Sequence, residues 1–257
     1  MLKCEMKAYY INLDRNPERR DHLLAQWGSA GGRIERISAV DASLMSESQL
    51  RTFTEARPRK RWLAGQIGCF LSHFEAWSRI SAGDDDLAAI FEDDLHINGE
   101  LHRLLENSEW APADADIIRL ESAKQSVRIL NKRALANGRT IGRLGSGVGG
   151  SGAYIIRRDT AQCLLNTPPR WHKPTDFFLF DSFSSPIARA LTTYQVSPAP
   201  CAQDKFLSDT TRRVGFASDI ENQKSTSLRR QAVATVAITI AKPVWRLLAN
   251  KSLIRFG

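Results

Sequence analysis

The sequence predicts an α/β fold built on a parallel sheet, with a C-terminal helical extension, and three observations support this prediction. The chain opens with a strand, helix, strand pattern. Residues 87–91 form a short apolar run that ends abruptly in three carboxylates. Residues 222–257 are basic and carry no acidic side chain, which predicts an amphipathic helical extension outside the sheet. A chain of 257 residues, 42% hydrophobic and 25% charged, is long enough for one sizeable core.

The opening of the chain predicts a βαβ unit. Residues 7–13 (KAYYINL) are β-branched, aromatic and apolar, which favours a first strand. Asn16 is a good helix N-cap, Pro17 suits the first helical position, and Gly28 ends the helical pattern. Residues 33–40 supply a second short strand, so we expect two parallel strands in one sheet.

Residues 65–80 predict an amphipathic helix. Apolar residues recur there at spacings of three and four and form one face: Ile67, Phe70, Leu71, Phe74 and Trp77. The opposite side carries Gly65, Gly68 and Ser72, so another backbone or a flat ligand can approach it closely.

The acidic triplet Glu92-Asp93-Asp94 is the most informative feature. The apolar residues before it predict a central strand that is buried on both faces. Ligands of open α/β sheets bind at the carboxyl ends of strands, and carboxylates there suit a hard divalent cation. The alternative is an acidic surface turn, which we expect of residues 84–86. The buried strand in front of the triplet favours a metal site.

The rest of the body predicts three further strands, at residues 116–120, 153–156 and 193–196, with a helix after the second that Asp159 would cap. The glycine-rich stretch 142–152 predicts a flexible segment. Because it precedes a strand, it is not a dinucleotide-binding fingerprint. A mobile loop beside a site and a plain surface connection both remain open.

The net charge of +8 is concentrated at the C-terminal end. Residues 222–257 contain seven basic residues, so subtracting +7 leaves about +1 for residues 1–221. We therefore expect a nearly neutral catalytic domain at 1–221, a basic segment at 222–257, and no nucleic acid as partner.

The basic segment predicts a helix that lies on a membrane. Its apolar face comprises Val233, Val236, Ile240, Val244 and Leu247. The unbroken apolar part, residues 232–241, is about half of the ~20 residues that a spanning helix needs. A terminal helix packed on the body is the alternative. A second basic cluster at residues 57–61, beside Trp62, could meet anionic lipid or acceptor phosphates.

The cysteines and the N-terminus indicate a cytoplasmic protein. The N-terminal residues lack the apolar region that export requires. The cysteines are scattered, which argues against a disulfide framework or a structural zinc site and favours free thiols: Cys4, Cys69, Cys163 and Cys201.

Four motifs, in order and spacing, resemble glycosyltransferase family 25, the bacterial lipopolysaccharide glycosyltransferases. They are YINLDR at 10–15 with Arg19-Arg20, RISAVD at 36–41, GQIGCFLSH at 65–73 and IFEDD at 90–94. Similar stretches at 151–156 and 174–176 extend the match over roughly residues 7–205. The resemblance implies a GT-A-like fold with a mixed, mostly parallel sheet, and the inverting transfer of a hexose, often galactose, from its UDP-activated form.

The resemblance also implies roles for individual residues. A departing UDP accumulates negative charge, which Mn²⁺ or Mg²⁺ can neutralise. Asp94, together with Asp93, would hold that metal, and Glu92 would bind it through water or orient a neighbour. The residues expected to bind the donor are Asn12, Leu13, Arg15, Arg19, Gly68, His73, Glu92 and Tyr154. A solvated helix face for Arg19 and a structural role for His73 are the alternatives.

An inverting displacement needs a base that deprotonates the acceptor hydroxyl. Asp176 is the predicted base, so that Asp94 and Asp176 form the predicted catalytic pair. Asp181 and Glu121 are rivals for the base, and the alternative for Asp176 is a helix N-cap.

The sequence thus predicts a metal-dependent UDP-hexose transferase at the cytoplasmic face of the bacterial inner membrane. Its acceptor would be a lipopolysaccharide or lipooligosaccharide core, or another lipid-linked glycan. Two alternatives are a non-catalytic basic module that binds membrane or nucleic acid, and a metal-dependent nucleotide-sugar phosphohydrolase with water as its acceptor. The sequence does not choose between galactose and glucose.

Overall fold

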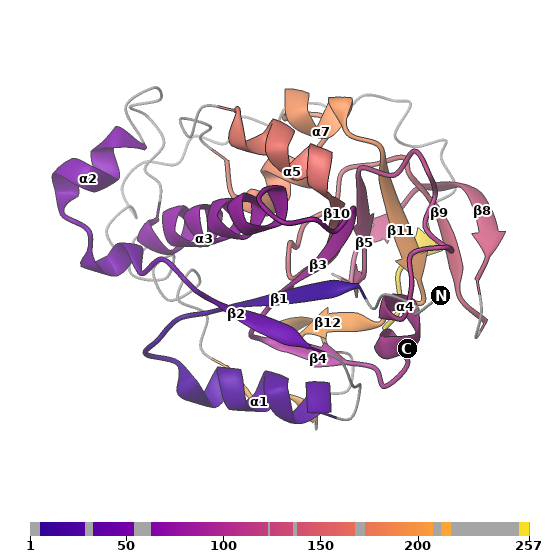
Figure 1. Cartoon of the computed structure of the whole chain (residues 1–257), viewed down its shortest axis with the longest axis horizontal. Helices are drawn as coiled ribbons and strands as arrows, with labels where there is room; N and C mark the ends of the chain where they lie inside the picture. Colours follow the sequence, from indigo (N-terminus) through magenta and orange to yellow (C-terminus); the bar gives the residue numbers. More distant parts are fainter. Residues whose placement is uncertain are drawn as a thin grey trace, which may run out of the picture.

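An eight-stranded sheet forms the centre of the molecule (Figure 1). The computed structural model describes residues 6–28, 33–53, 63–122, 124–135, 138–167, 173–207, 212–216 and 252–256. The strand order is β2-β1-β3-β10-β5-β11-β9-β8. The strands are β1 (Lys7–Asn12), β2 (Ile34–Ser38), β3 (Leu87–Glu92), β5 (Ile117–Arg119), β8 (Ile129–Ala134), β9 (Thr140–Leu144), β10 (Ala153–Arg157) and β11 (Thr193–Ser197).

The sheet is mixed and mostly parallel. β1 runs parallel to β2 and β3, and β5 runs parallel to β11. β10 is antiparallel to both of its neighbours, β3 and β5, and β9 is antiparallel to both β11 and β8. The other six strands therefore point the same way, and the predicted α/β architecture with a mixed, mostly parallel sheet is confirmed.

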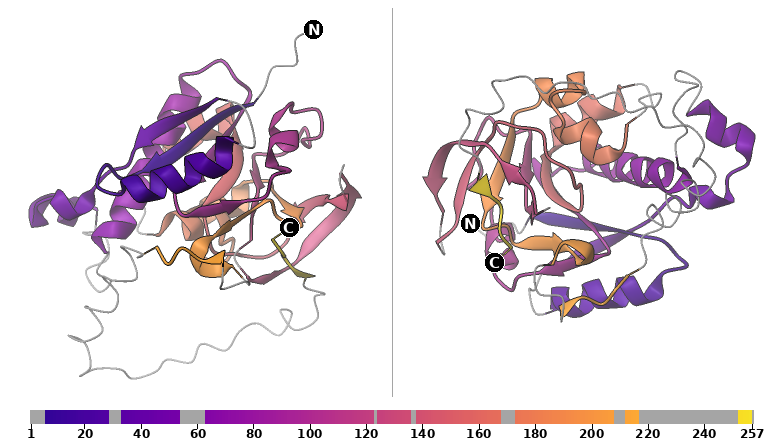
Figure 2. Two further views of the ribbon diagram at one scale, coloured as in Figure 1. Left: turned by 90° about the horizontal axis from the view of Figure 1, so that it is seen from below. Right: turned by 180° about the vertical axis from the view of Figure 1, so that it is seen from behind.

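Helices cover both faces of the sheet. They are α1 (Pro17–Gly28), α2 (Glu47–Thr52), α3 (Ala64–Ser81), α4 (Leu101–Leu105), α5 (Arg158–Leu165), α6 (Thr175–Phe180) and α7 (Pro186–Ala190). The views in Figure 2 place α1 and α3 on opposite sides of β1. Alternate residues of β3 divide the core accordingly: Phe91 packs with residues of α1, and Ile90 packs with residues of α3. The predicted central strand, buried on both faces, is confirmed.

A small second sheet adjoins the acidic triplet. It consists of β4 (Leu95–Ile97), β12 (Cys201–Gln203) and β6 (Glu121–Ser122), in the order β4-β12-β6. The turn at Asp93-Asp94 connects β3 of the large sheet with β4 of the small one. The triplet therefore lies where the two sheets meet, between β3 of the large sheet and β4 of the small sheet.

The glycine side of α3 is packed against backbone. A Cβ placed on Gly68 would lie 2.5 Å from the carbonyl oxygen of Val40. Ser72 Oγ accepts a hydrogen bond from the Val40 amide at 2.8 Å and donates one to the Gly68 carbonyl at 2.6 Å. The predicted close approach of another backbone is confirmed, and it fixes the segment after β2 against α3.

Two local expectations are corrected. Residues 140–144 form strand β9, so the first part of the glycine-rich stretch belongs to the sheet and only residues 145–152 form a loop. The helix after β10 begins at Arg158 with Arg157 at the N-cap, so Asp159 lies in the first turn and does not cap it. The three cysteines that the structure describes, Cys69, Cys163 and Cys201, are free.

The last described residues of the chain pack on the body. Strand β13 (Ser252–Leu253) pairs with β7 (Ser126–Val127), and Ile254 is buried in the core. The rest of the basic segment and the cluster at 57–61 lie outside the described residues. Within the described ranges, none of the helices is both long and apolar enough to span a membrane.

Candidate active site

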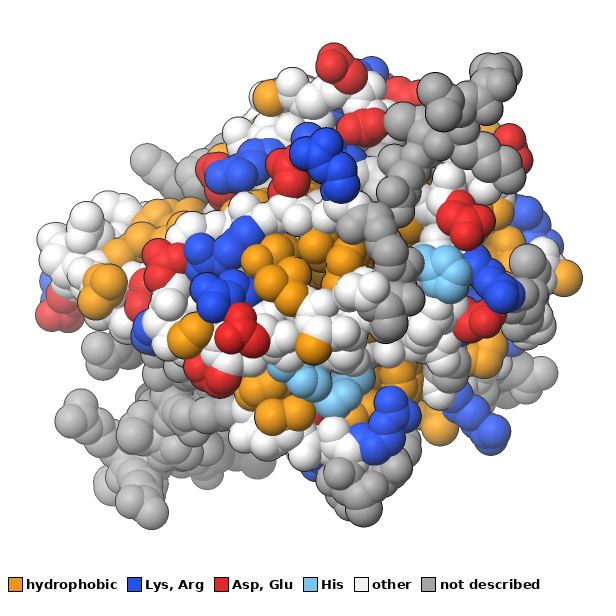
Figure 3. Space-filling model, turned by 60° about the horizontal axis from the view of Figure 1, so that its bottom comes forward, with side chains coloured by type: hydrophobic (Ala, Val, Ile, Leu, Met, Phe, Trp, Pro, Cys, Tyr) orange, Lys and Arg blue, Asp and Glu red, His pale blue; other side chains and the backbone are white. Residues whose placement is uncertain are grey.

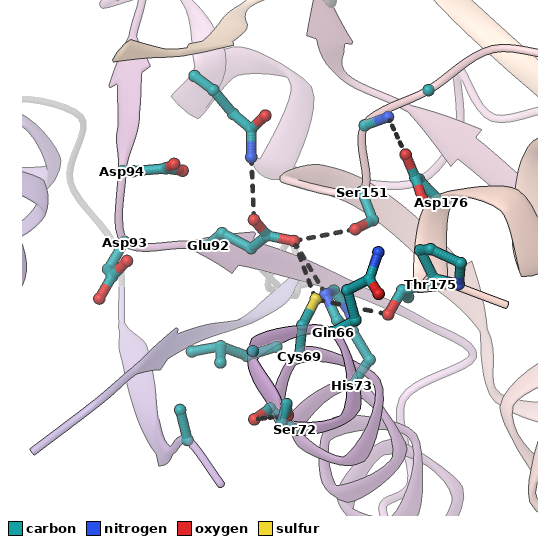
Figure 4. Close-up of a pocket in the computed structure, with 18 of the residues that line it drawn as sticks. Gln66, Cys69, Ser72, His73, Glu92, Asp93, Asp94, Ser151, Thr175 and Asp176 are labelled. Carbon is teal, nitrogen blue, oxygen red and sulfur yellow. Dashed lines mark hydrogen bonds and ion pairs between the residues drawn. The ribbon is translucent and has the colours of Figure 1, made fainter. Parts of the chain in front are cut away.

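A cavity of about 530 Å³ opens at the carboxyl ends of β1 and β3. Its wall includes the end of β1, the segment after β2, the first half of α3, the acidic triplet, the glycine-rich loop and the start of α6 (Figure 4). The 3-10 helix at Asp204–Phe206 contributes Lys205 and Phe206. This volume is in the range of small-molecule sites.

Glu92 accepts hydrogen bonds from three side chains of the cavity wall. Its Oε1 accepts hydrogen bonds from His73 Nε2 at 3.1 Å and from Ser151 Oγ at 2.9 Å. Gln203 Nε2 donates to Oε2 at 2.9 Å. Burial opposes ionisation, but the His73 and Ser151 donors outweigh it and lower the pKa of Glu92 to about 2. Glu92 therefore orients its neighbours as an ionised acceptor.

The other two carboxylates of the triplet differ from one another. Asp93 accepts a hydrogen bond from Asn12 Nδ2 at 2.7 Å and pairs with Arg19 Nη2 at 2.5 Å. Asp94 lies 3.5 Å from the same Arg19 nitrogen, and its Oδ1 is buried with no hydrogen-bond partner among the described residues. Figure 4 shows the two side chains leaving the chain in different directions.

Burial raises the pKa of both aspartates. The pKa of Asp93 rises to about 7, although Arg19 and Asn12 act in the opposite direction. Burial also raises the pKa of Asp94, against the attraction of Arg19. A further positive charge beside these two groups would favour their ionised forms. The unpartnered Asp94 oxygen therefore fits the predicted role of a ligand for a hard cation.

The residues predicted to bind the donor fall into two groups. Those on the cavity wall are Leu13, Arg15, Arg19, Gly68, His73 and Glu92. Arg15 forms an ion pair with Asp41, another residue of the wall. Asn12 and Tyr154 lie behind the wall as the structure describes it, and both side chains are buried. Donor contacts of Asn12 and Tyr154 stay a prediction.

Asn12 and Tyr154 support wall residues. Asn12 holds Asp93 and also accepts a hydrogen bond from Arg36 Nε at 3.1 Å. The Tyr154 hydroxyl accepts from Trp77 Nε1 at 2.9 Å and lies 2.9 Å from His73 Nδ1. With Glu92 ionised, the network assigns the His73 proton to Nε2, so that Nδ1 accepts from the hydroxyl. His73 thus bonds the acidic motif.

Three ionisable side chains hold the glycine-rich loop in place. Asp176 Oδ2 accepts from the Gly150 amide at 3.1 Å, and Glu121 Oε2 accepts from the Gly152 amide at 2.7 Å. Arg119 Nη2 donates to the Gly149 carbonyl at 3.0 Å. The loop is therefore a formed part of the wall.

The three predicted candidates for the base occupy different positions. Asp176 lies on the cavity wall in the first turn of α6, where Pro174 holds the N-cap position, so the N-cap alternative is corrected. Asp181 also lines the cavity, but its carboxylate accepts from the Phe183 amide and from Ser184 Oγ in its own turn. Glu121 is 1% exposed beneath Gly150.

Comparison with known proteins identifies the family. Residues 5–179 match the model described as Glycosyltransferase family 25 (LPS biosynthesis protein). The chain belongs to glycosyltransferase family 25. This confirms the predicted family. The chain is therefore a glycosyltransferase, and the description of its family names lipopolysaccharide biosynthesis.

Curated relatives agree with this assignment. The lacto-N-neotetraose biosynthesis glycosyltransferase LgtE of Neisseria meningitidis is 28% identical, over 96% of this chain and 91% of its own length. The lipooligosaccharide biosynthesis protein lic2B of Haemophilus influenzae is 25% identical, over 96% of each chain. The human procollagen galactosyltransferase 2 is 27% identical, over 89% of this chain and 39% of its own.

Sequence reasoning missed several residues of the family 25 site. Cys69 stands within the matched motif at 65–73 but was given no role beyond a free thiol, yet it lies on the cavity wall beside Glu92. Ser151 stands within a matched motif, which was a usable signal. Gln203 and Lys205 lie beyond the matched residues 5–179, and an isolated amide or lysine there carries no local signal.

The charges outside the site are mixed. On the face shown in Figure 3, basic and acidic side chains lie next to one another. This distribution agrees with a nearly neutral body.

Proposed function

We propose that the protein is an inverting glycosyltransferase that transfers a hexose, galactose in the first instance, from a UDP-sugar to a lipooligosaccharide or other lipid-linked acceptor. The observation that carries the proposal is the cavity at the carboxyl ends of β1 and β3, where Asp94 presents a buried, unpartnered oxygen beside Arg19. The names of the Neisseria, Haemophilus and human relatives support the acceptor class and the choice of galactose.

Asp94 and Asp93 are the residues that would hold Mn²⁺ or Mg²⁺. Such a metal would supply positive charge to a departing UDP. Arg19 already places a guanidinium against both carboxylates, at 2.5 Å from Asp93 and 3.5 Å from Asp94. Its fork suits a phosphate as well as a carboxylate, so Arg19 is positioned to bind the diphosphate when a cation takes over the carboxylates.

Asp176 is the proposed base for the acceptor hydroxyl. It lies on the wall, and one of its oxygens is oriented by the Gly150 amide. Asp176 Oδ1 accepts from the Phe177 amide at 2.8 Å, so Asp176 and Asp181 are both engaged by amides of their own turns, and Asp181 stays the rival candidate. Glu121 lies under the loop, which makes it less suited to accept a substrate proton.

Acceptor-dependent UDP release tests the proposal. Purified protein is incubated with UDP-galactose or UDP-glucose, Mn²⁺ and a core-oligosaccharide acceptor. Asp94→Asn should lower kcat/KM by about 10² or more, because it removes stabilisation of the departing charge. Asp84→Asn, in the exposed acidic turn before β3, is the matched control and should retain the wild-type rate.

Three outcomes would count against the proposal. Full activity of Asp94→Asn would remove the role of the carboxylate. UDP release that does not depend on the acceptor would indicate a phosphohydrolase. Absence of release with either donor, together with retained membrane binding, would favour a non-catalytic module.

We also propose that the basic segment at 222–257 holds the enzyme on the anionic inner face of the inner membrane. Because residues 252–256 pack on the body, the test should leave them in place. Replacing Lys224, Arg229, Arg230, Lys242 and Arg246 by Gln should weaken cosedimentation with anionic liposomes and spare turnover of a soluble acceptor. Unchanged liposome affinity would refute this assignment.

A further inference from the structure

A second group of potential metal ligands lies on the cavity wall, apart from Asp93 and Asp94. Cys69, His73 and Glu92 each offer one ligand atom, and the three atoms lie within 4.8 Å of one another. Cys69 Sγ is 4.0 Å from Glu92 Oε1, and His73 Nε2 is 3.1 Å from the same oxygen. Figure 4 shows the three side chains converging from α3 and from the end of β3.

The helix α3 and the strand β3 place these three atoms close to one another. Cys69 and His73 are four residues apart on α3, so they project from the same side of the helix. Glu92 ends β3 opposite them and is fixed by Ser151 and Gln203. The ligand atoms are therefore preorganised by a helix and a strand.

The spacing suits a tetrahedral cation. Zinc bonds of about 2.0 Å to nitrogen or oxygen and 2.3 Å to sulfur separate tetrahedral ligand atoms by about 3.3 to 3.6 Å. The observed separations from Glu92 Oε1, 3.1 Å to His73 and 4.0 Å to Cys69, lie on either side of that range. The third separation, between Cys69 Sγ and the His73 nitrogen, is within 4.8 Å, so side-chain adjustment would complete the geometry. Three protein ligands leave a fourth position for water.

We propose that Cys69, His73 and Glu92 bind one borderline transition-metal ion such as Zn²⁺, at a site distinct from the hard-cation carboxylates. Thiolate and imidazole select Zn²⁺ or Co²⁺ over Mg²⁺, whereas Asp94 offers only oxygen. The Tyr154 hydroxyl, 2.9 Å from His73 Nδ1, supports the ligand from the far side of the ring.

Binding of the metal ion releases one proton from the protein. The Cys69 thiol loses its proton to solvent as the metal–sulfur bond forms. The His73 proton moves from Nε2 to Nδ1, where it can be donated to the Tyr154 oxygen, and Glu92 coordinates as the carboxylate that it already is. Metal binding at Cys69, His73 and Glu92 does not depend on which reaction takes place at Asp93 and Asp94. The two proposals can therefore be tested separately.

Cobalt substitution tests the site. Titrating metal-free, full-length protein with Co²⁺ should give a thiolate-to-cobalt charge-transfer absorption that saturates at one ion per chain and disappears when Zn²⁺ is added. Cys69→Ser should weaken binding at least tenfold and abolish the band. Cys163→Ser and Cys201→Ser, which change an exposed and a buried thiol elsewhere, should retain both.

Two further measurements make the result decisive. X-ray absorption of the zinc-loaded wild type should show one sulfur at about 2.3 Å, independently of how any variant folds. Asp94→Asn should leave the cobalt band unchanged, which separates this site from the hard-cation site. A first shell without sulfur, or a band that survives Cys69→Ser, would overturn the proposal.

Discussion

Replacing Glu121 by Gln should change how the stability of the fold depends on pH. Glu121 is 1% exposed, and its Oε1 has no hydrogen-bond partner among the described residues. Among the described residues its ion-pair partner is Arg119, with 3.7 Å between Oε2 and Nη2. Burial outweighs this attraction and raises the pKa of Glu121 to about 8, from an ordinary value of 4.5.

The sign of the effect follows from the raised pKa. The folded state holds the Glu121 proton more tightly than the unfolded state does, so stability is greatest below about pH 4.5 and is lost as pH rises toward about 8. Between pH 5 and pH 8 the difference is about three pH units at 1.36 kcal/mol each, on the order of 4 kcal/mol. Glu121→Gln removes this dependence and keeps an acceptor for the Gly152 amide.

Urea unfolding at pH 5, 6, 7 and 8 measures the effect. The free energy of unfolding of Glu121→Gln, relative to wild type, should rise by several kcal/mol across this range. Exposed Glu109→Gln is the control for exchanging a carboxylate for an amide. Parallel curves for Glu121→Gln and wild type would refute the reasoning.

Two further predictions concern packing and charge. Gly68→Ala should lower the free energy of unfolding by about 1–3 kcal/mol, reduced in part by the better helix propensity of Ala, because its Cβ would meet backbone 2.5 Å away. Gly28→Ala, with no atom within 4 Å of the new Cβ, should stay within about 0.5 kcal/mol, and equal urea midpoints for the two variants would contradict the account. Arg19→Gln should lower stability by about 1 kcal/mol or less at pH 7 and by more at pH 8–9, because Asp93, with a pKa of about 7, takes up a proton when it loses its cation, and this uptake costs less at low pH than at high pH. Millimolar Mn²⁺ should restore part of that loss in a thermal unfolding assay, and a variant as stable as wild type at pH 8–9 would refute the pairing.

The sequence was sufficient for features that depend on neighbours along the chain. The apolar run before Glu92 predicted a buried central strand, because a strand covered on both faces needs no polar alternation. Pro17 and Gly28 marked a helix whose ends follow from backbone chemistry. The small side chains around Gly68 predicted the close approach of another segment, although not which one. The order of the motifs was enough to predict the family.

The tertiary structure decided how three adjacent carboxylates differ. Their partners stand far away in sequence: Asn12 and Arg19 beside Asp93, and Gln203 beside Glu92. Burial and pairing set the ionisation of a carboxylate, and neither is a local property of the chain. For the same reason the sequence did not show that Tyr154 is buried with its hydroxyl beside His73. Local pattern determined which elements form, and long-range packing determined which of their side chains face the cavity.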